Sequence, residues 1–102
     1  MNPLIKIKRL VLAGKVLFTE KAEAEIAADH LSKNLIYEAI WNAPAINKTI
    51  RSKNPKSGER ETLYIIKGLT FDGLAIYTKG KILTFQNQEI FYVLISSKKA
   101  FD

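Results

Sequence analysis

The 102-residue sequence contains no cysteine and only one histidine. The lack of cysteine excludes disulfides, thiolate metal sites and cysteine nucleophiles, and it fits a reducing compartment, so we expect a cytoplasmic protein. The nearest approach to a cation site is His30 beside Asp29, with Glu20, Glu23 and Glu25 upstream. Because these residues form no compact ligand set, we expect neither a metal nor another cofactor.

Long apolar runs are also missing. The most apolar N-terminal stretch, residues 3–12, is interrupted by Lys6, Lys8 and Arg9, whereas a bilayer span needs about 20 apolar residues. The sequence therefore predicts no membrane helix and no signal peptide. It also lacks a P-loop, a dinucleotide-binding glycine pattern and a recognisable Ser-His-Asp set.

What is present is enough material for one folded domain with a basic surface. Hydrophobic residues make up 47% of the chain, including five Phe, four Tyr and one Trp, which suffices for a core without disulfides. The formal net charge of +6 attracts polyanions such as nucleic acid. The alternative is that this charge only keeps a small protein soluble.

Capping residues and apolar spacing predict three helices within residues 3–42. Asn2 followed by proline is typical of a helix start, and Gly14 indicates the end of that helix. Thr19 and Ser32 are the expected N-caps of the second and third helices, and Pro44 prevents the third from continuing.

After Pro44 the apolar period changes to two, which is typical of strands. Asp72-Gly73 predicts a hairpin turn between two of these strands. Residues 80–88 fit either an extension of the third strand or a separate short strand turning at Asn87. The expected order is a strand over 45–51, a loop over 52–59, and strands over 61–67 (or 63–69), 74–79 and 89–97.

Helices followed by adjacent strands indicate an α+β class, with N-terminal helices packed on one face of a mostly antiparallel sheet in a single domain over 1–102. Alternation divides the strand residues between two faces, which a slip of one residue would exchange. On the covered face we expect Leu63, Ile65, Leu74, Ile76, Phe91, Val93 and Ile95. On the opposite face we expect Tyr64, Tyr77, Lys79, Tyr92 and Lys98.

The expected tyrosine and lysine face is the main chemical signal, because aromatic rings stack on bases and ammonium groups neutralise phosphate. Its structural alternative is that tyrosines simply cover a half-buried sheet. A basic loop beside the sheet suits a phosphate backbone, although it also fits an ordinary solvated loop. The residues expected to bind RNA are Arg51, Lys53, Lys56, Arg60, Tyr64 and Tyr92.

Several segments resemble the motility quorum-sensing regulator (MqsR) toxins, which are similar to the RelE superfamily of bacterial toxins. The resemblance extends over most of the chain and is carried by Lys8–Val16, Thr19, Ala22, Leu35–Ile40, Asn47–Thr49 and Val93–Lys98. A second resemblance, to small RelE-related domains of similar size, is carried by Phe18–Ala22, Leu31–Ser32 and Glu38–Ile40.

The resemblance implies a RelE-like fold, ribosome-independent RNA cleavage and neutralisation by an antitoxin protein. It also implies functional roles for Lys48, Tyr77 and Lys98. A glutamine of the family pattern has no counterpart in residues 64–67. Because alternation groups Lys48 with neighbouring isoleucines, it would face the core unless a bulge intervenes. We therefore base the site on Tyr77 and Lys98 ahead of Lys48.

The leading hypothesis is a toxin-type endoribonuclease, or mRNA interferase, that uses the 2′-hydroxyl of its substrate and no metal. Lys98 and Lys79 would stabilise charge at phosphorus, while Tyr77 would position the phosphate or transfer a proton. Free phenol and ammonium groups have pKa values of about 10 and 10.4, so a base role requires burial or repulsion to lower one of them.

The expected partners are RNA and a cognate antitoxin protein, and a homodimer is compatible with the sequence. One alternative is a non-catalytic RNA-binding module that uses the same residues. Another is a protein-interaction module, in which Tyr64, Tyr77 and Tyr92 would form an interface patch.

Overall fold

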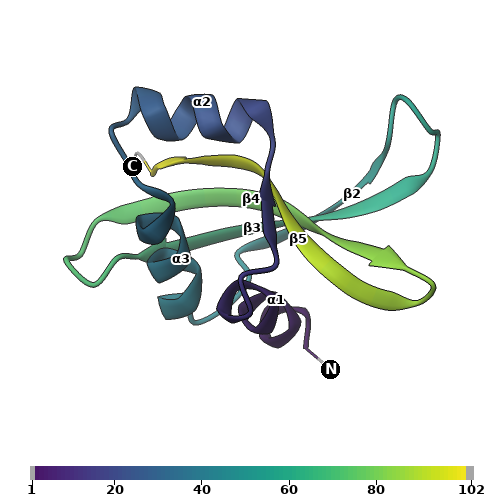
Figure 1. Ribbon diagram of the computed structural model, residues 1–102, viewed down its shortest axis with the longest axis horizontal. Helices are drawn as coiled ribbons and strands as arrows, with labels where there is room; N and C mark the ends of the chain where they lie inside the picture. Colours follow the sequence, from purple (N-terminus) through teal and green to yellow (C-terminus); the bar gives the residue numbers. More distant parts are fainter. Residues whose placement is uncertain (1, 101–102) are drawn as a thin grey trace.

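A computed structural model describes residues 2–100 of the chain as three helices and one five-stranded sheet (Figure 1). The sheet order is β1-β5-β4-β3-β2, with β1 parallel to β5 and every other pair antiparallel. This confirms the predicted α+β class, while the short parallel β1 was not predicted. The elements are α1 (Pro3–Leu12), β1 (Val16–Phe18), α2 (Glu20–Ala28), α3 (Lys33–Asn42), β2 (Lys48–Lys53), β3 (Arg60–Leu69), β4 (Ala75–Phe85) and β5 (Gln88–Lys99).

The helices begin at the capping residues that the sequence indicates. Side-chain oxygens of Asn2, Thr19 and Ser32 accept hydrogen bonds from the first-turn amides of α1, α2 and α3, at 2.8, 3.2 and 3.3 Å. These bonds satisfy amides that have no partner inside the helix. Within the described residues, no helix is long and apolar enough to cross a bilayer.

All three helices pack on the same face of the sheet and enclose the core with it. The covered face contributes Ile66, Ile76, Tyr92 and Leu94, one or two residues from each of β3, β4 and β5. Gly68 permits the close approach of α3, because a Cβ there would overlap the backbone of Ala39. The helical core residues are Leu4, Ile7, Leu10, Val11, Ile26, Ile36, Ala39 and Ile40.

The predicted hairpin at Asp72-Gly73 forms, and its turn consists of the three residues Phe71, Asp72 and Gly73. Thr70 and Leu74 pair across it through a 2.9 Å hydrogen bond, and Gly73 has a φ of +89°, as three-residue hairpins require. With this turn Gly68 pairs with Ile76, so Ile66 and Tyr64 share the face of Ile76. The expected faces were therefore wrong for Leu63, Ile65 and Tyr64: the first two lie on the uncovered face and Tyr64 on the covered face.

The register of β5 is set by a tight turn and two bulges. Gln86 and Asn87, both with positive φ, turn the extended β4 directly into β5, so residues 80–85 continue the third predicted strand. Ile90 and Ile95 are extra residues without partners in β4. Between these bulges Tyr92 and Leu94 face the core, which corrects the expectation for Tyr92, Phe91 and Val93.

The bulge at Ile95 reverses the faces again over the last part of β5. Ser97 pairs with the buried Thr78 and is itself buried, whereas Lys98 pairs with Tyr77 on the uncovered face. The predicted outward positions of Lys98, Tyr77 and Lys79 are therefore confirmed, and the inward position of Ile76 is confirmed as well.

The two hairpin arms of the sheet separate at one end. The ladder between β3 and β4 runs from Leu69 and Ala75 to Tyr64 and Gly80, where it stops. Beyond that point the β2–β3 arm and the β4–β5 arm point in different directions, as the right side of Figure 1 shows. The separation opens a cleft between them that is bordered by α1.

Candidate functional site: a lysine–tyrosine cluster

Within residues 2–100, four of the lysines on the uncovered face lie around one tyrosine. Lys67, Tyr77 and Lys98 lie side by side in one row across β3, β4 and β5. In the next row, Lys79 and Lys48 are separated only by a residue of β3. We call these five residues the lysine–tyrosine cluster. None of them is buried, so all five present their side chains to solvent.

The cluster is strongly cationic. Lys98 Nζ lies 5.5 Å from the centroid of the Tyr77 ring, within the range of a cation–π contact. No carboxylate among residues 2–100 lies within ion-pair distance of Lys48, Lys67 or Lys79. Their charges are therefore uncompensated, and they suit a ligand with closely spaced negative charges.

One carboxylate, Glu25 of α2, borders the cluster. Its Oε1 accepts hydrogen bonds from Ser96 Oγ at 2.8 Å and from the Ser97 amide at 3.1 Å. Its Oε2 lies 4.0 Å from Lys98 Nζ. Because α2 fixes this carboxylate at the edge of β5, Glu25 holds the Lys98 ammonium on the side of the cluster.

All four residues predicted to be catalytic, Lys48, Tyr77, Lys79 and Lys98, fall in this cluster. The expected inward position of Lys48 was wrong. Lys48 is exposed without any bulge in β2, because Lys48 and Ile50 lie on the uncovered face of the strand. Ile46 does pack against the core, but it precedes β2, so its position does not fix the face of Lys48. Sequence reasoning missed Lys67 and the role of Glu25. The pairing of Lys67 with Tyr77 across the hairpin is the signal that could have identified Lys67.

The residues predicted to bind RNA do not gather on this face. Arg51, Lys53 and Arg60 lie on the other side of the β2–β3 arm, where they line a hollow of about 370 Å³. Lys56 lies in the loop between β2 and β3. Tyr64 packs against the core and lines the cleft between the arms.

Tyr92 was wrongly expected on the binding face. It is 0% exposed, so it is not available to stack on a base. Burial raises the pKa of its phenol well above the ordinary value, and the neighbouring Tyr64 raises it further. Its hydroxyl has no hydrogen-bond partner in the described part of the molecule.

The acidic and histidine residues near α2 have structural roles. Asp29 Oδ2 accepts the Lys99 amide at 2.9 Å, and His30 has a φ of 56° where the helix ends. Together with Glu25, Asp29 covers the edge of β5 beyond β1. Within residues 2–100, no three metal-ligating side chains of histidine, aspartate or glutamate come together.

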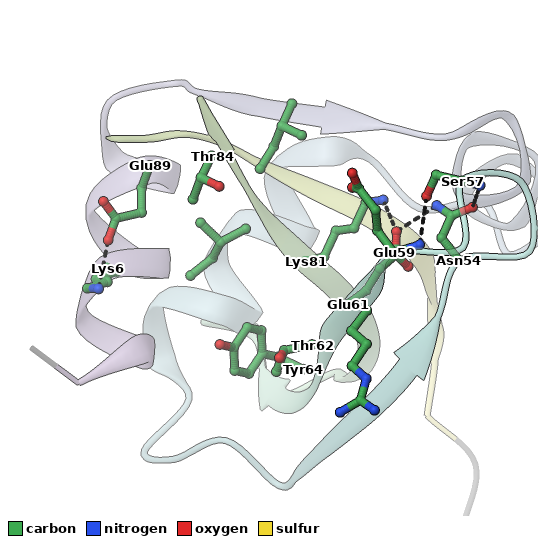
Figure 2. A pocket seen from close by; sticks show the side chains of 13 residues that line it. Lys6, Asn54, Ser57, Glu59, Glu61, Thr62, Tyr64, Lys81, Thr84 and Glu89 are labelled. Atoms are coloured by element: carbon green, nitrogen blue, oxygen red, sulfur yellow. Dashed lines mark hydrogen bonds and ion pairs between the residues drawn. The ribbon is translucent and has the colours of Figure 1, made fainter. Parts of the chain in front are cut away.

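The cleft between the arms is a second hollow, of about 480 Å³ (Figure 2). Lys81 Nζ lies 2.7 Å from Glu61 Oε1, which also accepts a 2.7 Å hydrogen bond from Asn54. On the other side, Lys6 Nζ lies 2.7 Å from Glu89 Oε1. Figure 2 shows Tyr64 and Thr62 between these two groups.

The two ion pairs keep both carboxylates charged. The hydrogen bonds from Lys81 and Asn54 lower the pKa of Glu61. The hydrogen bond from Lys6 lowers the pKa of Glu89 in the same way.

Comparisons of the chain with protein-family models, with curated proteins and with solved structures find no match.

Proposed function

We propose that the protein is a toxin-type endoribonuclease whose RNA substrate lies across the lysine–tyrosine cluster. The observation that carries the proposal is the juxtaposition of Tyr77 with Lys98 and Lys79, beside two further lysines that pair with no carboxylate of residues 2–100. Such a surface concentrates positive charge where a phosphate must be held, and it contains a phenol able to exchange a proton. The resemblance to MqsR-like toxins of the RelE superfamily supports the same activity.

In the proposed reaction the substrate supplies its own nucleophile. The 2′-hydroxyl attacks the adjacent phosphorus and gives up its proton to solvent water, while the bond from phosphorus to the 5′-oxygen breaks. A 2′,3′-cyclic phosphate forms, and the leaving 5′-oxygen takes up a proton from water and departs as a hydroxyl group. Lys98 and Lys79 stabilise the extra negative charge that develops on the phosphoryl oxygens. Tyr77 donates a hydrogen bond that orients the phosphate, and Lys48 and Lys67 hold the flanking backbone.

The decisive experiment is cleavage of a defined RNA by the purified protein in the presence of a chelator. We expect cutting to continue, and the same RNA with one 2′-deoxy position at the scissile step to stay intact. The product should carry a 2′,3′-cyclic phosphate or its hydrolysis product. Activity that is abolished by chelator and restored by magnesium would overturn this mechanism.

A second candidate function, a protein-interaction module, is favoured by an apolar surface on the helix side. Leu12 and Phe71 are 74% and 72% exposed, and Trp41 is 46% exposed. With Tyr37 they border a hollow of about 290 Å³ between α1, α3 and the β3–β4 turn. Exposed apolar patches of this kind mark interaction sites.

Both functions can belong to one protein if the apolar surface anchors the cognate antitoxin, which we propose as the protein partner. We propose a cytoplasmic location as well, since the proposed substrate is messenger RNA. Leu12→Ser combined with Phe71→Ser should leave RNA cleavage unchanged and weaken neutralisation by the product of an adjacent reading frame. Unchanged neutralisation at equal abundance would remove this surface from the proposal.

A further inference from the structure

The side of the β2–β3 arm that faces away from the lysine–tyrosine cluster carries a second group of basic residues. Lys53 and Arg60 are paired directly across the two strands. Arg51 lies two residues before Lys53, and Thr62 lies opposite Arg51. Because alternate strand residues share a face, these side chains project from the same side of the arm, and all of them line the hollow of about 370 Å³. We call Arg51, Lys53 and Arg60 the arm site.

The positive charges of the arm site are exposed and uncompensated. All three side chains are exposed, and no carboxylate among residues 2–100 lies within ion-pair distance of any of them. Glu61 also lines the hollow, but its carboxylate is engaged by Lys81 and Asn54, at 2.7 Å each. The arm projects away from the helices (Figure 1), so both of its sides are open to a ligand.

The pairing of Lys53 with Arg60 opposes folding. Like charges directly opposite each other on an antiparallel pair of strands are destabilising, and Arg51 adds a third positive charge on the same side. Local rules of this kind are broken mainly where a site serves a function. An anionic ligand that lies among the three side chains removes the repulsion between them.

The lining of the hollow favours a phosphate backbone over a peptide. Every residue that lines it is charged or carries a hydroxyl, whereas interfaces between proteins have an apolar core. Surfaces that bind nucleic acid are more polar and more positive. The two guanidinium groups can each donate two parallel hydrogen bonds to phosphate oxygens, and the lysine adds a point charge.

We propose that the arm site binds phosphate groups of the RNA backbone away from the step that is cut. This inference rests on the proposed function, since the ligand is the same RNA. Three positive charges exceed the single charge of one phosphodiester, so the arm site holds two neighbouring phosphates.

The order of the sheet leaves a path for one strand of RNA to reach both sites. β2 is an edge strand, so no further strand of the sheet lies beyond it. Lys48, on the cluster side of β2, is three residues from Arg51, which is about 10 Å along an extended strand. An RNA strand that lies on the cluster therefore reaches the arm site by passing around the edge of β2.

The test measures binding of a labelled 2′-O-methyl RNA of about ten nucleotides, which lacks the attacking hydroxyl, at several salt concentrations. For a single strand, each phosphate contact adds about 0.7 to the slope of log affinity against log salt. Arg51→Ala combined with Arg60→Ala should therefore lower the slope by about 1.4 and weaken binding by about tenfold or more at low salt. Lys15→Ala combined with Lys21→Ala removes the same charge from exposed positions elsewhere and should leave the slope nearly unchanged.

Cleavage by the same variant separates the arm site from the cluster. Because the arm site does not touch the reacting phosphate, kcat at saturating RNA should stay within about twofold of the native value, while KM rises by about tenfold. Lys98→Ala should instead lower kcat, and its RNA binding should still lose slope when Arg51 and Arg60 are replaced.

The repulsion within the arm site gives an independent measurement. Lys53→Glu makes the pair with Arg60 attractive, so at low salt it should raise the urea midpoint of unfolding and weaken RNA binding more than Lys53→Ala does. A Lys53→Glu variant that binds RNA as tightly as the native protein would overturn the site.

The remaining outcomes distinguish the two proposals. A slope that falls no more in the arm variant than in the lysine control overturns the arm site and leaves the proposed function standing. A native protein that cleaves no RNA, but whose binding loses slope on replacement of Arg51 and Arg60, overturns the proposed function and keeps the arm site. Displacement of the RNA by an oligoglutamate as effectively as by unlabelled RNA of equal charge would make this a site for acidic peptides and overturn its assignment to phosphate.

Discussion

The phenol end of Tyr92 lies directly over Gly80, so closely that a Cβ at position 80 would come 2.5 Å from Tyr92 Cζ and 2.6 Å from its oxygen. Only glycine fits beneath this ring, because real side-chain atoms do not approach so closely. The pair lies where the ladder between β3 and β4 stops. A side chain at position 80 would therefore have to displace the Tyr92 ring at this point of the sheet.

Gly80→Ala should lower the free energy of unfolding by about 1–3 kcal/mol, the usual range for overpacking a core. Urea denaturation measures the loss. In a Tyr92→Leu background the ring is gone, so the same substitution should cost less. Equal costs in the two backgrounds would show that the clash with Tyr92 is not the cause.

Tyr92→Phe should leave the protein equally stable or stabilise it by up to about 1 kcal/mol, because the substitution removes a buried hydroxyl that has no hydrogen-bond partner among the described residues. Thermal and urea denaturation at neutral pH would show the change. A destabilisation above about 1 kcal/mol would mean that the hydroxyl is hydrogen-bonded after all.

Tyr77→Phe and Lys98→Ala should each reduce RNA cleavage by about 100-fold or more, since each removes a group that acts on the reacting phosphate. Their unfolding free energies should stay within about 0.5 kcal/mol of the native value, because neither side chain is buried. Growth inhibition on overexpression and cleavage by purified protein are the two measurements.

Lys21→Ala is the matched control for the cluster, since it removes one positive charge from the exposed surface of α2. It should weaken cleavage only slightly, because it lowers only the overall positive electrostatic potential of the protein. Equal losses for Lys21→Ala and Lys98→Ala would assign the effect to net charge and not to the cluster.

Stability should fall in acid partly through Glu61. The pKa of this carboxyl is lowered in the fold from an ordinary 4.5 by its hydrogen bonds to Lys81 and Asn54, so its contribution is present above that value and is lost as the pH falls through the folded pKa. Glu61→Gln should thus be less stable than the native protein at pH 6. The difference should shrink as the pH falls below the ordinary value of 4.5 and through the lowered pKa of the folded protein. A difference that stays constant as the pH is lowered until the protein unfolds would contradict this origin.

Local signals predicted the helices well, because a cap is decided by residues two or three apart. Thr19 and Ser32 begin α2 and α3 for reasons visible in the sequence itself. The strands were also predicted, but the face that each side chain occupies depends on the exact number of residues in the turns and bulges. The three-residue turn at the Asp72-Gly73 hairpin places Tyr64, and not Leu63, on the covered face. No local residue preference indicates that turn length.

The candidate site was only partly predicted, because its residues also depend on which face of the sheet each strand position occupies. Tyr77 and Lys79 follow the turn closely and lie on β4, where alternation is regular. The inward position predicted for Lys48 was wrong because the alternating residues of β2 that include Lys48 were assigned to the covered face of the sheet. Glu25 gave no signal, because its contacts with Ser96, Ser97 and Lys98 join residues about 70 positions apart in the sequence.

The extra residue at Ile95 makes the cluster sensitive to insertions and deletions more than to exchanges of one amino acid for another. Lys98 reaches the uncovered face only because the chain takes one additional step before Ser96. Loss of a single residue between Leu94 and Ser97 would hardly change the composition of the protein. It would nevertheless turn the Lys98 ammonium toward the core and Ser97 toward solvent, since successive strand residues point to opposite sides.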